Sequence, residues 1–161
     1  MADSSEFESI CPYNDAEAVE ALNKVANHPA VLAISEYLFP DEPITFLRNA
    51  LKSVHNIDEF QEIVMNKAVS WVMDHTIHNF SYDGISYIKE LKGKFLAMSN
   101  HRDIILDPAI TQQVLFRNGI PMTEICVGDN LIKQCMTVEY LLRSNRMIRV
   151  IRGISARELY L

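Results

Sequence analysis

The sequence predicts an α/β protein in which a helical first half precedes a partial, mainly parallel sheet. All five glycines lie in the second half of the 161 residues, and glycine marks tight strand–helix turns, whereas long helices avoid it. The first half shows apolar residues at helical spacing, and the second shows short apolar runs between helical segments. We therefore expect a helical accessory region at 1–76 and a strand–helix domain at 77–161.

The first helices are predicted from capping residues and prolines. Asp15 is placed to cap a helix that reaches about residue 26, and Pro29 precedes a second helix at about 30–38. The acidic and proline residues at 41–43 are typical of a third helix start. These features together predict a helical arrangement without strands in this part of the chain.

A longer helix is predicted to begin after Asn56 and to end near Asp74. Asn56 and Glu59 have the spacing of a capping box, in which each side chain binds the other residue's main-chain N–H group. Apolar residues then recur every three or four positions, so we expect one buried stripe. The stripe consists of Ile57, Phe60, Ile63, Val64, Ala68, Trp71 and Val72.

The second half is predicted to alternate strands with helices. The expected strands are 77–82, 95–99, 123–127 and 147–151. The expected helices are 85–91, 108–118 and one that runs from Gly128 toward Arg143. The last three strands and the two helices between them form a βαβαβ pattern, which implies right-handed crossovers and a mainly parallel sheet. Ligands bind beyond the carboxyl ends of such strands, where His101 and Arg152 are expected.

The segment after the expected strand 95–99 carries residues suited to acid–base chemistry. Its histidine, His101, has the side-chain type whose pKa suits a general base near neutral pH. A carboxylate from Asp103 or Asp107 would orient the imidazole and stabilise its charged form. The alternative is a surface turn in which Asp107 caps the next helix and His101 is solvated.

Three motifs of residues 77–161 resemble the glycerolipid acyltransferases of the lysophosphatidate type, and in particular a bacterial branch with preceding helices. Ser99-Asn100-His101 followed by an aspartate is similar to the first family motif, and the run 123–131 is similar to a family phrase. The apolar strand that ends at Arg152 is similar to the second motif. Asp107 follows His101 after five intervening residues, whereas the family pattern has four, and no third Glu-Gly motif occurs.

The resemblance implies an acyltransferase-like sheet and the transfer of a fatty acyl group from an acyl thioester to a glycerol-phosphate or lysophospholipid hydroxyl. The thioester would be acyl-CoA or acyl carrier protein, with no bound cofactor and no metal. His101 would be the general base, with Asp107 as its first-choice partner and Asp103 as the fallback. The remaining implied residues are Arg152 and Arg149 for the acceptor phosphate and Asn100 and Arg102 at the edge of the site.

The charge and cysteine content limit the classes of partner and the cellular location that we expect. A formal net charge of −6 argues against a general nucleic-acid binder, although residues 133–161 hold six basic and two acidic residues that suit an anionic ligand. Three cysteines without metal-ligand spacing are expected to be reduced thiols of a cytoplasmic protein, with Cys126 in the core. His75 and His78 lack a visible third metal ligand. Because the resemblance implies a lipid acceptor, we also expect peripheral contact with the inner membrane face.

The last residues resemble a helix start that is not continued. Residues 155–158 have the spacing of a capping box, and only three residues follow. We expect the chain to be the N-terminal part of a longer protein or a natural truncation of one, inactive alone, with a partly exposed strand at 147–151 that favours self-association. The alternative function is a non-catalytic interaction module that retains an incomplete acyltransferase fold.

Overall fold

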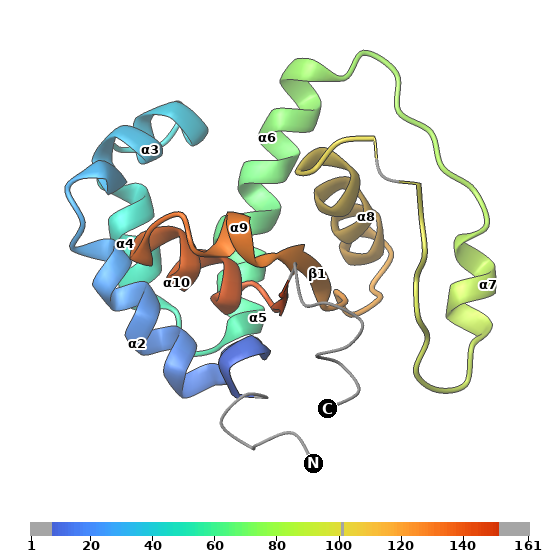
Figure 1. The fold of residues 1–161 in the computed structure, drawn as a ribbon. Helices are drawn as coiled ribbons and strands as arrows, with labels where there is room; N and C mark the ends of the chain where they lie inside the picture. The colour runs from blue at the N-terminus through green and yellow to red at the C-terminus, as the bar shows by residue number, and fades with distance from the viewer. Residues whose placement is uncertain (1–7, 101, 152–161) are drawn as a thin grey trace. The chain divides into compact units, whose positions relative to one another are not determined.

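The computed structural model describes residues 8–100 and 102–151 (Figure 1). The chain divides into two compact units. Unit 1 combines Met1–Met65 with Glu124–Leu161, and unit 2 is Asn66–Thr123. The described residues form mostly helices and one small parallel sheet, so the coarse α/β class is confirmed. The boundary between the helical accessory region and the strand–helix domain, expected between residues 76 and 77, stays a prediction.

The first part of unit 1 is helical, as predicted. Its elements are α2 (Asp15–Ala26), α3 (Ala30–Leu38), α4 (Phe46–Ser53), α5 (Ile57–Phe60) and the π-helix η1 (Gln61–Met65). α2 packs against α4 on one side and against α10 (Met136–Ser144) on another (Figure 1). Leu22, Leu51 and Phe60 are fully buried in this core. The third helix begins at Phe46, and residues 41–43 lie in the connection that precedes it.

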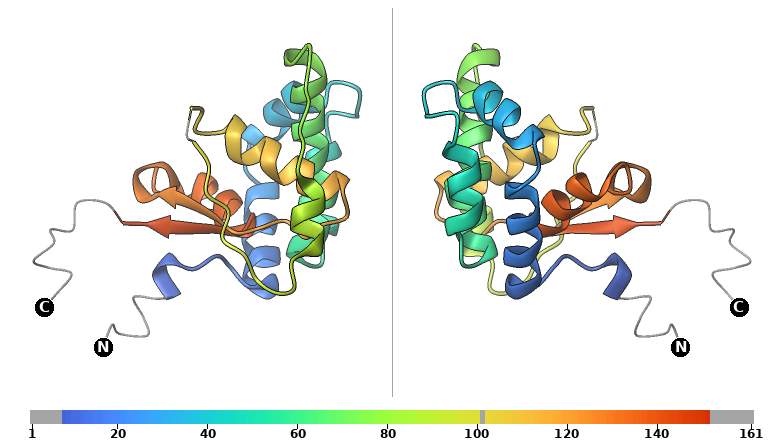
Figure 2. Two further views of the ribbon diagram at one scale, coloured as in Figure 1. Left: turned by 90° about the vertical axis from the view of Figure 1, so that its right-hand side faces the viewer. Right: turned by 90° about the vertical axis from the view of Figure 1, so that its left-hand side faces the viewer.

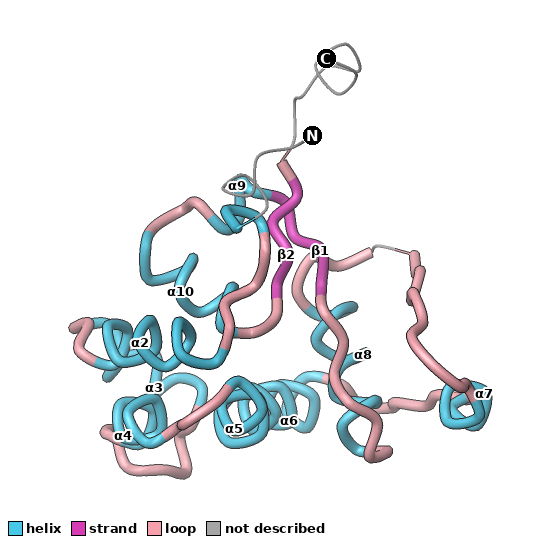
Figure 3. The backbone as a smooth tube through the Cα atoms, turned by 90° about the horizontal axis from the view of Figure 1, so that it is seen from below, coloured by secondary structure: helices cyan, strands magenta, loops and turns pink. Residues whose placement is uncertain are grey.

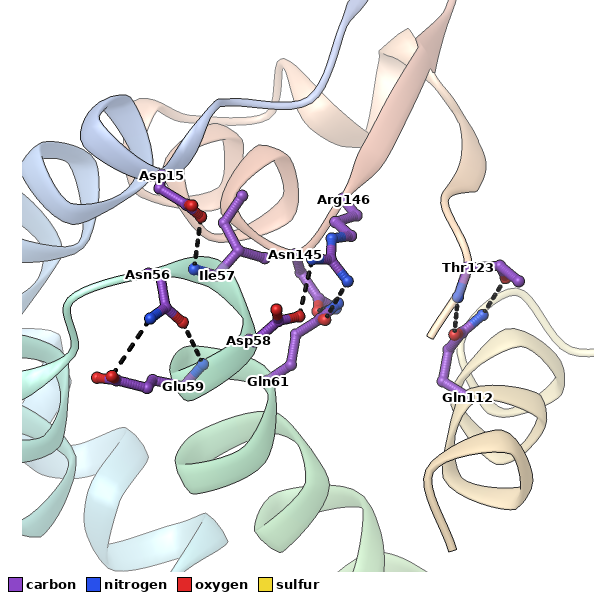
Figure 4. Close-up of polar contacts among 10 residues, drawn as sticks. All are labelled: Asp15, Asn56, Ile57, Asp58, Glu59, Gln61, Gln112, Thr123, Asn145 and Arg146. Carbon is purple, nitrogen blue, oxygen red and sulfur yellow. Dashed lines mark hydrogen bonds and ion pairs between the residues drawn. The ribbon is translucent and has the colours of Figure 1, made fainter. Parts of the chain in front are cut away.

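The cap of α2 differs from the prediction by one residue. Asn14 caps the helix: its side chain accepts a hydrogen bond from the N–H of Glu17, and Glu17 binds the N–H of Asn14 in return. Asp15 instead accepts a hydrogen bond from the N–H of Ile57 at 3.0 Å, so it links α2 to the start of α5 (Figure 4). The predicted cap residue therefore joins two helices that are distant in sequence.

The predicted long helix is present as consecutive helical segments from residue 57 to residue 76. Asn56 accepts a hydrogen bond from the N–H of Glu59 at 2.8 Å, as predicted, but Glu59 binds the N–H of His55 and not that of Asn56. A π-helical turn begins at Gln61 and shifts the helical spacing of the stripe. For this reason Ile63 is 38% exposed, contrary to its expected place in a buried stripe.

The sheet consists of two strands among the described residues. β1 (Ile125–Gly128) lies beside β2 (Met147–Val150) in a parallel pair (Figure 3). In its register, Ile125 is opposite Met147 and Gly128 is opposite Val150. The connection contains α9 (Asp129–Ile132) and α10, so the single helix predicted here is divided in two. The parallel β–α–β connection between β1 and β2 is confirmed.

Unit 2 contains α6 (Asn66–Thr76), α7 (Ile85–Glu90) and α8 (Leu106–Arg117). α6 and α8 pack together, and the side chain of Gln113 donates a hydrogen bond to Ser70 at 2.7 Å. Gly119 has a φ of 69° and ends α8 as predicted, because the left-handed conformation costs glycine little.

The predicted strands at 77–82 and 95–99 are wrong. Both segments are drawn without a strand arrow (Figure 2), and within the described part of unit 2 no strand is available to pair with them. A strand needs a neighbour for its N–H and C=O groups. Without one, the apolar side chains of Leu96 and Met98 are 85% and 88% exposed, so the expectation of a buried strand fails with the pairing.

Candidate functional site

The turn in front of α8 carries the predicted site residues of unit 2. Asp107 lies in the first turn of α8, and its Oδ2 accepts hydrogen bonds from the main-chain N–H groups of Arg102 at 2.7 Å and Asp103 at 2.9 Å. The carboxylate therefore points back from the helix to the two residues that directly follow position 101. His101 itself lies outside the described residues.

Asp103 has a different task in the same turn. Its Oδ1 accepts hydrogen bonds from the N–H groups of Ile105 at 2.8 Å and Leu106 at 2.7 Å, so it satisfies donors at the start of α8. Negative charge at this end of a helix is also favoured by the helix dipole. The surface-turn alternative assigns the cap to Asp107, whereas the structure gives capping hydrogen bonds to Asp103.

The surroundings of this turn are open. Asn100, Arg102 and Asp103 are exposed, and Ile105 is 73% exposed. A shallow groove of about 410 Å³ lies elsewhere in unit 2 and is lined by Ile88, Lys89, Leu91, Gly93, Phe95, Gly119, Ile120 and Pro121. None of the predicted site residues that the structure describes lines this groove.

The predicted phosphate ligands belong to unit 1. Arg149 lies on β2, and its Nη1 donates a hydrogen bond to the carbonyl of Ser9 at 3.3 Å. Its Nε is buried and has no hydrogen-bond acceptor among the described residues. An unsatisfied buried donor is uncommon, and a ligand anion is one of the groups that satisfy it. Arg152, the other predicted ligand, lies outside the described residues.

Another arginine of the basic C-terminal segment, Arg143, joins parts of unit 1 that are distant in sequence. Arg143 donates to the carbonyls of Cys11 and Glu8 at 2.8 and 2.9 Å, and its guanidinium lies 4.2 Å from the ring centre of Tyr13. Burial raises the pKa of Tyr13, and the nearby Arg143 charge opposes this shift. These contacts show that the basic character of residues 133–161 is in part structural.

Arg146 joins a partly buried polar cluster that the sequence prediction missed. Its guanidinium binds Oδ1 of Asp58 at 2.8 Å and Oε1 of Gln61 at 3.1 Å, and Gln61 donates to Oδ1 of Asn145 at 3.0 Å (Figure 4). Gln61 is only 2% exposed. One sequence signal was available: Gln61 follows Ile57 by four residues, which places a polar amide on the buried face of a helix.

The cysteines and histidines form no recognisable metal centre in the described part of the chain, where no group of three His, Cys, Asp or Glu side chains could hold an ion. Cys126 is exposed, contrary to the expected core position, because β1 has no covering layer over that side chain among the described residues. Cys11 and Cys135 are also exposed, and all three thiols are free. His75 stacks on Trp71, with 4.5 Å between the ring centres.

The chain matches no protein-family profile, and neither a curated protein nor a solved structure shows significant similarity to it. Within residues 8–100 and 102–151, no helix combines the length and apolar character required to cross a membrane.

Proposed function

We propose that the protein is a glycerolipid acyltransferase of the lysophosphatidate type. It would transfer a fatty acyl group from acyl-CoA or acyl carrier protein to the hydroxyl of a glycerol phosphate or lysophospholipid. The described strands and helices would then be part of an acyltransferase-like sheet. The protein would act in the cytoplasm, in peripheral contact with the membrane that holds its acceptor.

The main support is the direction of the Asp107 side chain. The family pattern places an aspartate after the histidine, and here one more residue separates the two. Asp107 nevertheless reaches back across this turn and binds the N–H groups of Arg102 and Asp103. A carboxylate that fixes the residues next to His101 is suited to orient the imidazole, as in other carboxylate–histidine pairs. Asp103 is turned toward the start of α8, whereas Asp107 is turned toward the residues that follow His101, and this direction favours Asp107 as the partner.

In the proposed reaction, His101 takes the proton of the acceptor hydroxyl while the hydroxyl oxygen attacks the thioester carbonyl carbon. The tetrahedral intermediate then collapses, the carbon–sulfur bond breaks, and the thiolate leaves with a proton from the imidazolium. Arg149 and Arg152 would bind the acceptor phosphate, a group that the planar guanidinium suits. The unsatisfied Nε of Arg149 supports this assignment.

A second candidate function is a non-catalytic interaction module. The observation in its favour is the exposure of apolar side chains on both sides of the turn: Met98 is 88% exposed and Ile105 is 73% exposed. Exposed apolar surface of this kind is typical of contact sites. In this case the fold would be retained while the histidine and aspartate have no chemical role.

The test is an assay of acyl transfer by the protein as its gene encodes it. The substrates are palmitoyl-CoA or palmitoyl acyl carrier protein with glycerol 3-phosphate or lysophosphatidate. Because general bases contribute roughly 10²–10⁴-fold, we expect His101→Ala to lower kcat by at least about a hundredfold. His78→Ala is the matched control, since His78 is an exposed histidine of the same unit.

The outcomes separate the two candidates. Equal activity of His101→Ala and the unsubstituted protein would refute the assigned base. Absence of product from every donor and acceptor pair would refute the acyltransferase and favour the interaction module. Loss of activity in both histidine variants would indicate a structural effect and not a catalytic one.

A further inference from the structure

We propose that Arg146 is a positioning residue that fixes the start of β2 and, through it, the phosphate-binding side chain of Arg149. This inference rests on the proposed function, because it concerns the binding of the acceptor phosphate. Arg146 directly precedes β2, and Arg149 is the third residue of that strand. A change in how the chain enters β2 therefore moves Arg149 as well.

The main chain at Arg146 adopts a conformation that its residue type disfavours. Its φ is 57°, in the left-handed region that glycine and asparagine adopt far more readily. Among the described residues other than glycine, no other has a positive φ. Arginine at such a position requires compensating contacts from its side chain.

Those contacts come from α5, which contains Asp58, and from the first residue of the π-helix η1, Gln61. Asp58 and Gln61 bind the two ends of the Arg146 guanidinium, at 2.8 and 3.1 Å (Figure 4). Asp58 is mostly exposed, so its ion pair alone stabilises little. Gln61 is buried, and its amide also binds Asn145, the residue before Arg146. The buried amide therefore holds two consecutive residues at the entry to β2.

The forked guanidinium is essential to this arrangement. One nitrogen binds Asp58 and another binds Gln61, in different directions. Lysine carries the same charge on a single ammonium group, so it does not reproduce the planar fork that binds both partners. Arg146→Lys thus separates the role of geometry from the role of charge.

The experiment compares Arg146→Lys with the unsubstituted whole chain in two measurements. Hydrogen exchange of the β2 amides relative to those of α2 reports on how strongly the Arg146 contacts stabilise β2 against opening. Titration with glycerol 3-phosphate, followed by NMR or calorimetry, reports on phosphate binding. We expect exchange in β2 to accelerate and the Kd to rise, each on the order of tenfold, because a hydrogen bond to a charged group is lost.

Two controls separate positioning from general destabilisation. Val31→Ala removes buried side-chain volume from α3 and destabilises unit 1 without touching the cluster. Lys52→Met removes an exposed charge of α4. Both are expected to leave the Kd and the relative exchange of β2 within about twofold, since surface and remote changes rarely affect a distant contact.

Each outcome has a defined meaning. Unchanged exchange in Arg146→Lys would overturn the hold on β2. Faster exchange with an unchanged Kd, or no binding of glycerol 3-phosphate by the unsubstituted chain, would overturn the positioning role. If both quantities change as expected while the unsubstituted protein transfers no acyl group, the positioning role stands and the acyltransferase assignment fails.

Discussion

Unit 1 and unit 2 use their apolar side chains differently. Of the eighteen buried apolar side chains among the described residues, fifteen belong to unit 1 and three to unit 2. Nine of the fifteen large apolar side chains that stay exposed lie in unit 2. Stability is therefore concentrated in unit 1, while the candidate catalytic turn belongs to the less well-packed unit, from which binding loops are commonly drawn.

The largest expected effect is the loss of a core phenylalanine from unit 1. Phe60 is fully buried, so Phe60→Ala should cost about 3–5 kcal/mol in the free energy of unfolding. The counterpart in unit 2, Phe95→Ala, starts from a side chain that is 37% exposed and should cost under about 1 kcal/mol. Urea unfolding measures both values, and equal costs would contradict the difference between the units.

Removal of a hydrogen-bond acceptor at the start of a helix should have an intermediate effect, which differs between the two units. Asn56→Ala removes the acceptor for the N–H of Glu59 and should lower the free energy of unfolding by about 1 kcal/mol. Asp103→Ala removes the acceptor at the start of α8. If unit 2 opens locally, this variant should accelerate amide exchange in α8 with little change of the urea midpoint. A larger midpoint change for Asp103→Ala than for Asn56→Ala would contradict this account.

A smaller effect is expected in the pH dependence of unit 1. The main-chain N–H of His55 binds Glu59, and the His55 side chain adds to this, so the pKa of Glu59 lies below its usual value of 4.5. The ionised form therefore stabilises the fold above the unfolded pKa, and this contribution is lost as the pH falls through the folded pKa.

Unfolding of Glu59→Gln tests this sign. The variant should unfold at lower urea than the unsubstituted protein at pH 7, and the two midpoints should converge as the pH falls below 4.5. Glu90→Gln, at an exposed acid of unit 2, is the control for the loss of one surface charge. A gap that widens toward low pH would contradict the assignment.

The smallest expected effect tests the exposed segment of unit 2. Leu96 is 85% exposed, so Leu96→Ser should change the free energy of unfolding by no more than about 0.5 kcal/mol. Leu22→Ala, at a fully buried leucine of unit 1, should cost about 2–5 kcal/mol. A cost of that size for Leu96→Ser would show that residues 95–99 form the buried strand that the sequence predicts.

The elements that depend on local signals were predicted well. The cap at Asn56, the helix at 30–38 and the stop at Gly119 follow from short-range hydrogen bonds and from the freedom of glycine, which a sequence displays directly. The strand near 147–151 was also found, and Val150 is 41% exposed, as expected for an uncovered strand. Residues 155–161, where a further helix was expected, lie outside the described residues.

The elements that depend on distant partners were predicted poorly. Residues 95–99 have strand-like composition, but composition does not supply a neighbouring strand. Cys126 was expected in the core because its neighbours are apolar, yet burial requires a covering layer. The Gln61 and Arg146 cluster joins positions 85 residues apart, and no local pattern reveals such a pairing.

The most direct test of the central claim compares Asp107→Asn with Asp103→Asn in the acyl-transfer assay. If Asp107 orients His101, its substitution should lower kcat about a hundredfold, because removal of an orienting carboxylate impairs the base. Asp103→Asn should retain activity within about tenfold, since Asp103 binds the start of α8. Equal losses for the two variants, or a larger loss for Asp103→Asn, would contradict the account.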